Sequence, residues 1–239
     1  MDQVLLKDFF EEEDAHWWHA AKRRLIRQYL TKAHRRILVL GVGGGRLCAE
    51  LSQEHEVTAV DVSSVACKHA RQVYGIKAIE HDLEQGLPFG GEQFDAIVIA
   101  DVLEHIRHDK DLIAQMHRCL AKGGVLLVTV PAYAHMWSSW DLRLQHFRRY
   151  EFKQIKDLIT NGHFNITKIS FFNALIYPAA LLRRKILRVK ESSPSDFKIS
   201  QGGTLFSALM GVYYRAERAG VRMGVVPFGL SLFVCAEKS

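Results

Sequence analysis

Short apolar runs alternate with longer amphipathic stretches along most of the chain, and each kind of run predicts one kind of element. Continuously apolar runs of four to eight residues are typical of parallel strands that are buried on both faces. Amphipathic stretches between them are typical of helices. The predicted strands cover residues 37–40, a run that ends at Asp61, and residues 76–80, 94–100, 125–130, 164–172 and 228–237.

The regular alternation of strands and helices predicts an α/β fold with a doubly wound, mostly parallel sheet and helices on both faces. Such connections are right-handed, and ligands bind at the carboxyl ends of the strands. Residues 120–124, Leu-Ala-Lys-Gly-Gly, are predicted to end a helix before the fifth strand. Chemistry is therefore expected in the segments that follow the strands.

A glycine-rich turn follows the first strand. Gly41, Gly43 and Gly45 allow a tight bend and a close approach of the main chain to a ligand. Asp61, at the end of the next strand, suits a ribose diol, so the pattern predicts an adenosine-type cofactor. A dinucleotide fingerprint needs a third glycine or alanine where this chain has Arg46 or Cys48, depending on the register, so neither register fits.

Further signals follow in order along the chain. Asp82 follows the third predicted strand, where an acid can accept a hydrogen bond from an adenine amino group, and Leu83 comes next. The fourth strand leads into Asp101-Val102-Leu103-Glu104-His105, and the fifth ends at Pro131. With the closely spaced glycines, residues 35–131 resemble the class I S-adenosylmethionine-dependent methyltransferases.

This resemblance implies a seven-stranded sheet whose final strand is antiparallel. It also implies S-adenosylmethionine as cofactor and S-adenosylhomocysteine as product. The residues expected to bind the cofactor are Gly41, Val42, Gly43, Gly45, Asp61, Val62, Asp82, Leu83 and Ala100. One position departs from the family: Val39 stands where an acid usually helps to hold the methionine end. Main-chain groups around Gly41 and Gly43, or Arg46, are the alternatives for that role.

Length and composition predict one domain, because 239 residues with 48% hydrophobic content can bury a full α/β core. Its expected parts are an amino-terminal helical cap (1–34), a cofactor-binding core (35–131), a substrate lid (132–163), a helical insertion (173–227) between strands six and seven, and a closing strand (228–239).

Cysteine spacing and the amino-terminal segment indicate the compartment. The four scattered cysteines support neither a disulfide framework nor a zinc site, which favours a reducing cytoplasm. The first 14 residues lack the pattern of a secretory signal, and no charge-free apolar run reaches about 18 residues. The chain is therefore expected to be cytoplasmic, either soluble or peripheral at a membrane.

The formal charge of +6 raises the question of an acidic partner. Basic residues cluster at 22–36, 143–156 and 183–190. These clusters fall on helix-like segments, so solvated helix faces explain them more simply than an acidic or phosphorylated partner does. No pattern of interleaved aromatic and basic residues indicates an RNA module, which disfavours nucleic acid.

The predicted amino-terminal helix runs to about Leu30, with acids at 11–14 in its first turn. In the family that the chain resembles, such a helix lies over the cofactor, which makes Trp17 a candidate cofactor contact, together with His16 or Arg23. The alternative is that Trp17 packs this helix onto the sheet.

The segment after the fifth strand is dense in aromatic and polar groups, and loops at this position usually carry specificity. His146 with Asp141 is the first candidate for a general base that removes a proton from the acceptor, and His135 is the second. The alternative is that Asp141 caps a helix and His146 pairs with a neighbour. The residues expected to bind substrate are His135, Trp137, Trp140, Arg148 and Tyr150.

Asp101, Glu104 and His105 lie together after the fourth strand. The resemblance extends to quinone-type O-methyltransferases, in which a similar triplet is associated with a divalent ion. His105 as a base or substrate contact is a second interpretation, and packing is a third. We expect no metal and place His105 among the catalytic candidates.

The insertion contains two predicted helices, at 177–190 and 205–220. Apolar and basic residues occupy opposite sides of the first one. Such a helix could rest on anionic lipid, bind an acidic partner, cover the active site, or pack against its own sheet or a second subunit in a homodimer.

These patterns together favour a methyltransferase for a small-molecule or lipid-like, amphipathic acceptor, with oxygen favoured as the acceptor atom. Two rival hypotheses are a nucleic-acid methyltransferase, suggested by the basic balance, and a non-catalytic cofactor-binding scaffold, suggested by Val39.

Overall fold

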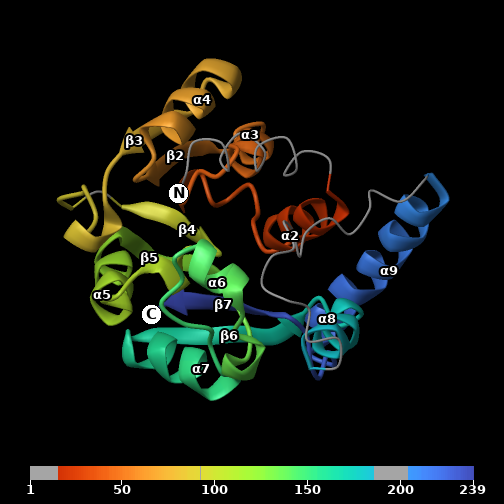
Figure 1. Ribbon diagram of the computed structural model, residues 1–239. Coiled ribbons are helices and arrows are strands. Elements are labelled where there is room, and N and C mark those ends of the chain that lie inside the picture. Colours follow the sequence, from red (N-terminus) through yellow and green to blue (C-terminus); the bar gives the residue numbers. More distant parts are fainter. Residues whose placement is uncertain (1–15, 92, 186–203) are drawn as a thin grey trace.

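A single twisted sheet forms the centre of the computed structural model, which describes residues 16–91, 93–185 and 204–239 (Figure 1). Its seven strands lie in the order β3-β2-β1-β4-β5-β7-β6. All neighbours are parallel except β7, which is antiparallel to both β5 and β6. The predicted doubly wound sheet with an antiparallel final strand is therefore confirmed. The strands are β1 (Arg36–Leu40), β2 (Glu56–Asp61), β3 (Lys77–Glu80), β4 (Phe94–Ala100), β5 (Leu120–Pro131), β6 (Phe164–Phe172) and β7 (Ser231–Lys238).

Helices cover both faces of this sheet. The helices are α2 (Trp17–Arg27), α3 (Arg46–Leu51), α4 (Ser64–Tyr74), α5 (Asp109–Cys119), α6 (Ser139–Arg143), α7 (Phe152–Asn161), α8 (Ile176–Lys185) and α9 (Thr204–Met223). Short 3-10 turns occur at η1 (Leu83–Gln85), η2 (Leu103–His105) and η3 (Ala134–Met136).

Alternate residues of the strands supply two apolar layers. Ile37 and Val39 of β1 face the layer formed with α2, α3, α4 and α9, whereas Leu38 and Leu40 face the layer formed with α5 and α7. This alternation follows from the period of two along a strand. Because both faces of β1 are covered, its run of apolar residues is unbroken, as the sequence pattern predicted.

The four cysteines, all within the described residues, are buried and form no disulfide bond. Cys48, Cys67 and Cys235 belong to the layer with α2, α3, α4 and α9, and Cys119 belongs to the opposite layer. Burial raises the pKa of Cys67 to about 11 and also raises that of Cys235. The thiols therefore act as small apolar groups of the core.

The amino-terminal helix differs from its prediction. The helix α2 begins at Trp17, after His16 accepts a hydrogen bond from the Trp18 N–H through Nδ1, and it ends at Arg27 rather than near Leu30. Its first turn contains no acid, and the acids at 11–14 lie outside the described residues. A histidine cap was not visible as a start signal, because Ser, Thr, Asp and Asn are the residues that usually mark one.

Two strand boundaries were also predicted wrongly. The helix α5 ends at Cys119 as expected, but β5 begins at Leu120, so the predicted stop segment 120–124 is already strand, with a register shift against β4 between Phe94 and Ala96. The closing strand begins at Ser231 rather than at 228.

The predicted lid at 132–163 contains a helix of the core. Ile155 and Ile159 of α7 are fully buried in the layer with α5, and Leu158 is nearly so. Residues 152–161 therefore support the sheet, and only the segment before α7 can face a ligand.

The insertion between β6 and β7 contains α8 and α9. In Figure 1, α9 projects past the edge of the sheet. The amphipathic pattern predicted for 177–190 lies partly outside the described residues, as do residues 186–203 between the two helices. In the described part of the chain, no helix is both long enough and apolar enough to cross a membrane.

Candidate active site

A cavity of about 1070 Å³ opens at the carboxyl ends of the central parallel strands. Its lining includes the glycine turn after β1, the ends of β2 and β4, the helix α2, the segment after α6, and α8. This is the position at which doubly wound sheets bind ligands, because β1 and β4 are neighbours whose connections leave in opposite directions. The residues predicted to bind cofactor and acceptor can therefore be compared with the residues that line this cavity.

The glycine turn is shaped by its contacts. Gly41 has φ +87°, and an added Cβ there would lie 2.3 Å from Cγ2 of Val102. Gly41, Val42 and Gly43 line the cavity, whereas Gly45 lies behind them, where it caps α3 with φ +86°. Val102 therefore leaves no room for a side chain at Gly41, and the bare main chain of the turn borders the cavity, as a closely bound cofactor requires.

Asp61 ties this turn to the end of β2. Its Oδ2 accepts a hydrogen bond of 2.7 Å from the Val42 N–H, and its Oδ1 accepts one of 2.8 Å from the Ser63 N–H. Val62, 66% exposed, lines the cavity beside it. Asp82 and Leu83 after β3 and Ala100 at the end of β4 also line it. The structure thus brings together eight of the ten predicted cofactor residues, namely all except Gly45 and Trp17.

Trp17 packs away from the cavity. Its ring lies 5.6 Å from that of Tyr214 and 6.2 Å from that of Phe206, both on α9. The neighbouring residues His16, Trp18, His19 and Lys22 line the cavity in its place. The contacts of Trp17 fit its alternative role, which was to pack this helix. His16 and Arg23, which were named with it as candidates, line the cavity. The spacing of His19, Lys22 and Ile26 on one helical face was a sequence signal for the rest of this surface.

His146 and Asp141 form the predicted pair. Nδ1 of His146 lies 3.0 Å from Oδ1 of Asp141, and Nε of Arg149 donates to the same oxygen at 2.7 Å. Burial alone would raise the pKa of Asp141, but the hydrogen bond with His146 and the charge of Arg149 lower it to about 2. Because Asp141 is therefore an ionised acceptor, Nδ1 of His146 carries the proton and Nε2 is the basic nitrogen.

Asp141 also fulfils the alternative role predicted for it. Oδ2 accepts a hydrogen bond of 2.8 Å from the Ser138 N–H, and the two residues form a capping box at the start of α6. The capping contact and the histidine contact use different carboxylate oxygens, so the two roles are compatible. The cap fixes Asp141 and, through it, the imidazole ring.

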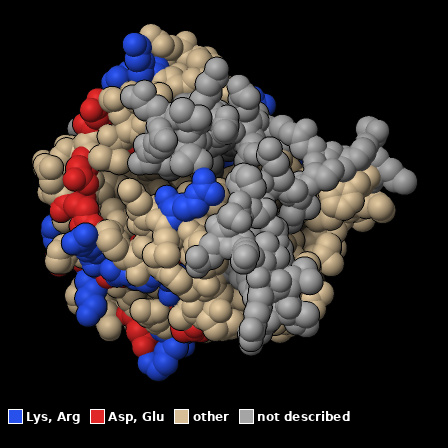
Figure 2. All heavy atoms as spheres, in the orientation of Figure 1, with Lys and Arg blue, Asp and Glu red and all other residues tan. Residues whose placement is uncertain are grey.

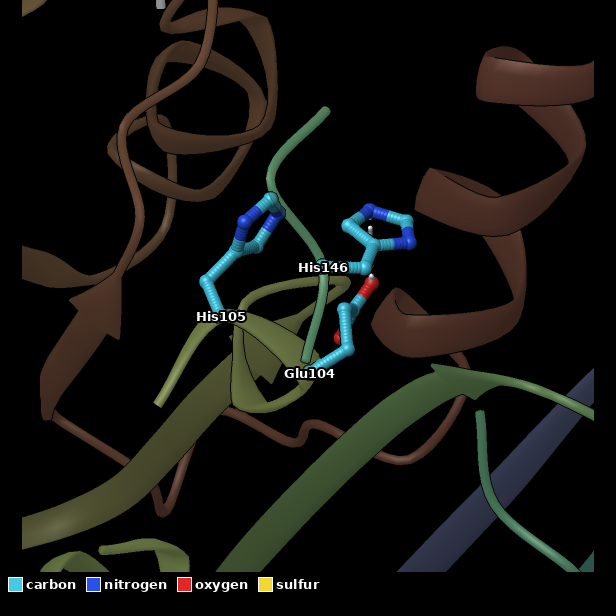
Figure 3. Close-up of side chains that lie close together, drawn as sticks. All are labelled: Glu104, His105 and His146. Carbon is cyan, nitrogen blue, oxygen red and sulfur yellow. Dashed lines mark ion pairs between the residues drawn. The ribbon is translucent and has the colours of Figure 1, made fainter. Parts of the chain in front are cut away.

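Glu104 and His105 lie next to this pair (Figure 3). The carboxyl group of Glu104 points toward His146, with Oε1 4.0 Å from Nε2, and the rings of His105 and His146 meet edge to face at 4.6 Å. Burial and the charge of Asp101 raise the pKa of Glu104 well above its ordinary value. Burial and the neighbouring His146 lower the pKa of His105 to about 4. Near pH 7 the His105 ring is therefore neutral, and the Glu104 carboxyl group is harder to ionise than an exposed one.

The three side chains Glu104, His105 and His146 each offer one atom within 4.8 Å of the others, which is compatible with a metal ion. The predicted triplet differed, since it contained Asp101 in place of His146. Asp101 instead forms an ion pair with Lys22 of α2 and accepts a hydrogen bond of 2.9 Å from the Thr129 hydroxyl.

Four of the five predicted substrate residues do not line the cavity, and Trp140 is the exception. Tyr150 is fully buried and donates a hydrogen bond of 2.9 Å to Asp109. Arg148 forms an ion pair with the same carboxylate. His135 lies within hydrogen-bond distance of the Tyr177 hydroxyl, and Trp137 is 38% exposed on the surface.

An apolar wall of the cavity was not predicted. Ile176 and Ala180 of α8 and Leu230 before β7 line part of the cavity. Ile176 and Ala180 lie in the insertion, for whose first helix covering the active site was one of several alternatives, and Leu230 lies in the segment predicted as the closing strand.

Comparisons with known proteins match the core of the chain to methyltransferases. Residues 38–128 match the family described as "Methyltransferase domain". A ubiquinone biosynthesis O-methyltransferase of Nitrosococcus oceani is 27% identical over 141 residues, which cover 48% of this chain and 56% of that protein. A ubiquinone/menaquinone biosynthesis C-methyltransferase of Stutzerimonas stutzeri is 35% identical over 104 residues, 39% of this chain and 40% of that protein. The matches thus span roughly half the length of these relatives.

A solved structure extends the likeness to nearly the whole chain. An S-adenosylmethionine-dependent methyltransferase from Thermotoga maritima superposes with a TM-score of 0.66 at 15% identity, covering 98% of this chain and 95% of that one. At this identity the superposition shows a shared fold.

Proposed function

Because residues 38–128 are a methyltransferase domain of the class I, Rossmann-like type, we propose that this protein transfers a methyl group from S-adenosylmethionine to a hydroxyl oxygen of a small, largely apolar acceptor. One observation carries the proposal. A single cavity joins the turn at Gly41 and the carboxylate of Asp61 to His146, whose imidazole is oriented by Asp141.

The donor half of the cavity supports the cofactor. Asp82 and Leu83 border the adenine end, Asp61 the ribose, and Gly41 the approach of the main chain. The donor supplies an activated methyl group on a positively charged sulfur. The residues of the chain have to hold that group and the acceptor in line, and such positioning can lower the barrier by about 7–11 kcal/mol.

The acceptor half supports proton removal. As the acceptor oxygen bonds to the methyl carbon, the carbon–sulfur bond breaks, S-adenosylhomocysteine forms and the hydroxyl proton moves to Nε2 of His146. The ionised Asp141 stabilises the imidazolium that results. The lowered pKa of His105 keeps its ring neutral near pH 7, so it adds no positive charge beside His146.

The apolar wall indicates the acceptor class. Ile176, Ala180 and Leu230 line the cavity and provide no charge. An aromatic or prenyl-bearing alcohol suits this wall better than a sugar or a peptide, because apolar surface gains about 25 cal/mol per Å² buried. Quinone precursors with a ring hydroxyl belong to this class, and the two relatives named for ubiquinone or menaquinone biosynthesis support an acceptor of this kind.

The surface favours a small acceptor over a nucleic acid. On the part of the face drawn in colour in Figure 2, basic and acidic side chains are interspersed, and uncharged atoms predominate between them. A nucleic-acid site would present a continuous basic stripe along the path of the phosphates. Contact of 177–190 with a membrane and formation of a homodimer remain proposals.

The proposal is tested with labelled methyl donor and a panel of phenols and alcohols with and without prenyl chains. We expect transfer to at least one phenolic member, with the label on oxygen when the product is examined by NMR. Label on carbon would contradict the proposed acceptor atom, and a panel that stays unlabelled while the protein binds S-adenosylhomocysteine would contradict the acceptor class.

Substitution Asp141→Asn tests the base. Loss of the carboxylate removes the orientation and stabilisation of His146, so kcat is expected to fall about 10²- to 10⁴-fold while the donor Kd changes little. Asp157→Asn is the matched control, because Asp157 pairs with Lys153 on the surface of α7. Equal kcat values for the two variants would contradict the assigned role. Circular dichroism of both variants checks that α6 keeps its cap.

A further inference from the structure

One ion pair inside the cavity has no role in the proton transfer just described. Lys22 of α2 pairs with Asp101, which follows β4, and the side chains are 14% and 34% exposed. Among the described residues, this is the one pair of a lysine or arginine with an acid in which both members line the cavity. Opposite charges are thus held together at a surface that faces a ligand.

Asp101 is fixed in its position by the backbone and by a neighbouring strand. Its φ of +54° is in the left-handed region, which is costly for a residue with a side chain. Its Oδ1 accepts the hydrogen bond from Thr129, whose side chain is buried, and its N–H donates to the Thr129 carbonyl at 2.9 Å. The carboxylate is therefore oriented before any ligand binds.

Among the described residues, the two arginines that line the cavity donate to acids that do not line it, and His19 beside Lys22 is neutral. Arg23 donates to Glu50, outside the cavity, and Arg149 donates to Asp141. Burial and the charge of Lys22 lower the pKa of His19 to about 3, so the ring is neutral near pH 7. Lys22 and Asp101 thus supply one positive and one negative charge at this end of the cavity.

The pair lies next to the glycine turn. Ala100, just before Asp101, is the neighbour of the Gly41 position, since Leu40 of β1 pairs with Ile99 of β4. Val102, just after it, contacts Gly41. A nucleoside with its base at Asp82 and its ribose at Asp61 extends along this turn toward Asp101. Val39 is apolar and 1% exposed, so β1 supplies no charge for the end of such a ligand.

We propose that Lys22 and Asp101 bind the amino-acid end of the donor, with Lys22 holding the carboxylate and Asp101 the ammonium group. This inference rests on the proposed function, because it assumes a nucleoside that carries a zwitterion. In the absence of donor the two side chains neutralise each other, and the donor replaces one ion pair by two. The chain thereby favours nucleosides with an amino-acid tail over nucleosides without one.

Ligands that differ only in the tail test the proposal on the unaltered protein. S-adenosylhomocysteine carries both charges, decarboxylated S-adenosylhomocysteine lacks the carboxylate, and 5′-methylthioadenosine lacks the whole tail. By titration calorimetry we expect S-adenosylhomocysteine to bind about 10- to 100-fold more tightly than 5′-methylthioadenosine. Equal affinities would overturn the proposal without any variant.

Two variants test which side chain binds which charged group of the ligand. Lys22→Met is expected to weaken S-adenosylhomocysteine by about 10-fold or more and to leave 5′-methylthioadenosine within about twofold. It should leave the affinity for decarboxylated S-adenosylhomocysteine largely unchanged, whereas Asp101→Asn should weaken the binding of that ligand too. Arg24→Met is the matched control, because Arg24 is an exposed cation on the same helix that does not line this cavity.

The outcomes separate this proposal from the proposed function. Unchanged preference for the tailed ligand in both variants would overturn the assignment of Lys22 and Asp101 while leaving the donor class intact. Failure of the unaltered protein to bind any of the three nucleosides would overturn the donor itself. Binding of 5′-methylthioadenosine by each variant shows that the variant is folded.

Discussion

His19 shows how a single buried side chain makes stability depend on pH. Its imidazole lies on the buried side of α2 and remains neutral, because burial and the charge of Lys22 hold its pKa near 3. An unfolded chain protonates the same ring below about pH 6.5. Between these two values the unfolded state binds one proton more than the folded state, so folding loses stability as the pH falls.

We therefore predict that His19→Gln reduces the loss of stability on acidification. Between pH 6.5 and 5, the His19 contribution to that loss is about 2 kcal/mol, since each pH unit below the unfolded pKa changes the free energy by about 1.4 kcal/mol. Urea unfolding at both pH values measures the difference for the native chain and the variant. A drop that is the same in both would contradict the assignment.

Two glycines with similar backbone angles should respond differently to alanine. Gly41→Ala would place Cβ 2.3 Å from Val102, whereas Gly75 has φ +67° with no atom within 4 Å of an added Cβ. We expect Gly75→Ala to cost about 1–2 kcal/mol of unfolding free energy and to leave donor affinity unchanged. Gly41→Ala should cost more and should abolish measurable binding of S-adenosylhomocysteine.

The comparison of the two glycine variants contains its own control. Both pay for the left-handed backbone, so the excess effect of Gly41→Ala reports the crowding against Val102. A Gly41→Ala protein that binds the donor with native affinity would show that the turn does not meet the ligand.

At the level of elements, α9 is attached to the sheet by buried polar groups. Oε1 of Glu217 accepts hydrogen bonds of 2.6 Å from the Ala174 N–H and from the Tyr213 hydroxyl. Tyr214 donates to Asn173 at 2.9 Å and packs against Trp17 of α2. Through these contacts α9 helps to hold α2 over the cavity.

Glu217→Ala is predicted to loosen both helices. Loss of the acceptor leaves the Ala174 N–H and the Tyr213 hydroxyl without this partner, which costs about 1–3 kcal/mol for a buried group. Hydrogen exchange should become faster in α9 and α2 but not in the central strands β1 and β4. Arg215→Ala, at an exposed position of α9, is the control, and equal exchange rates in the two variants would contradict the anchoring role.

The elements that could be predicted are those whose pattern has one physical cause. The strands β4 and β6 match their predicted limits, because an apolar run that is buried on both faces or packed against a helix has clear ends. The limits of α2 and β5 depend on a histidine cap and on a strand register, which arise only in the folded chain. For α7, the apolar face was present in the sequence but was assigned to a lid.

Across the whole molecule, predictability of the site depended on the separation of partners along the chain. His146 and Asp141 are five residues apart on one turn of chain, so their contact could be inferred. Tyr150 was placed in the lid because its partner Asp109 is 41 residues away. Lys22 and Asp101 are 79 residues apart, and only the packing of α2 over β4 brings them together.

The distribution of the cysteines between the two layers gives the protein natural reporters of local opening. A maleimide should leave all four thiols unmodified in the native state, since each is buried and thiolate formation is suppressed at Cys67 and Cys235. In rising urea, mass spectrometry of labelled peptides would compare Cys119 with Cys48, Cys67 and Cys235. Simultaneous labelling would mean that the halves of the molecule unfold as one cooperative unit, and earlier labelling of the larger set would mean that the side beneath α2 and α9 opens first.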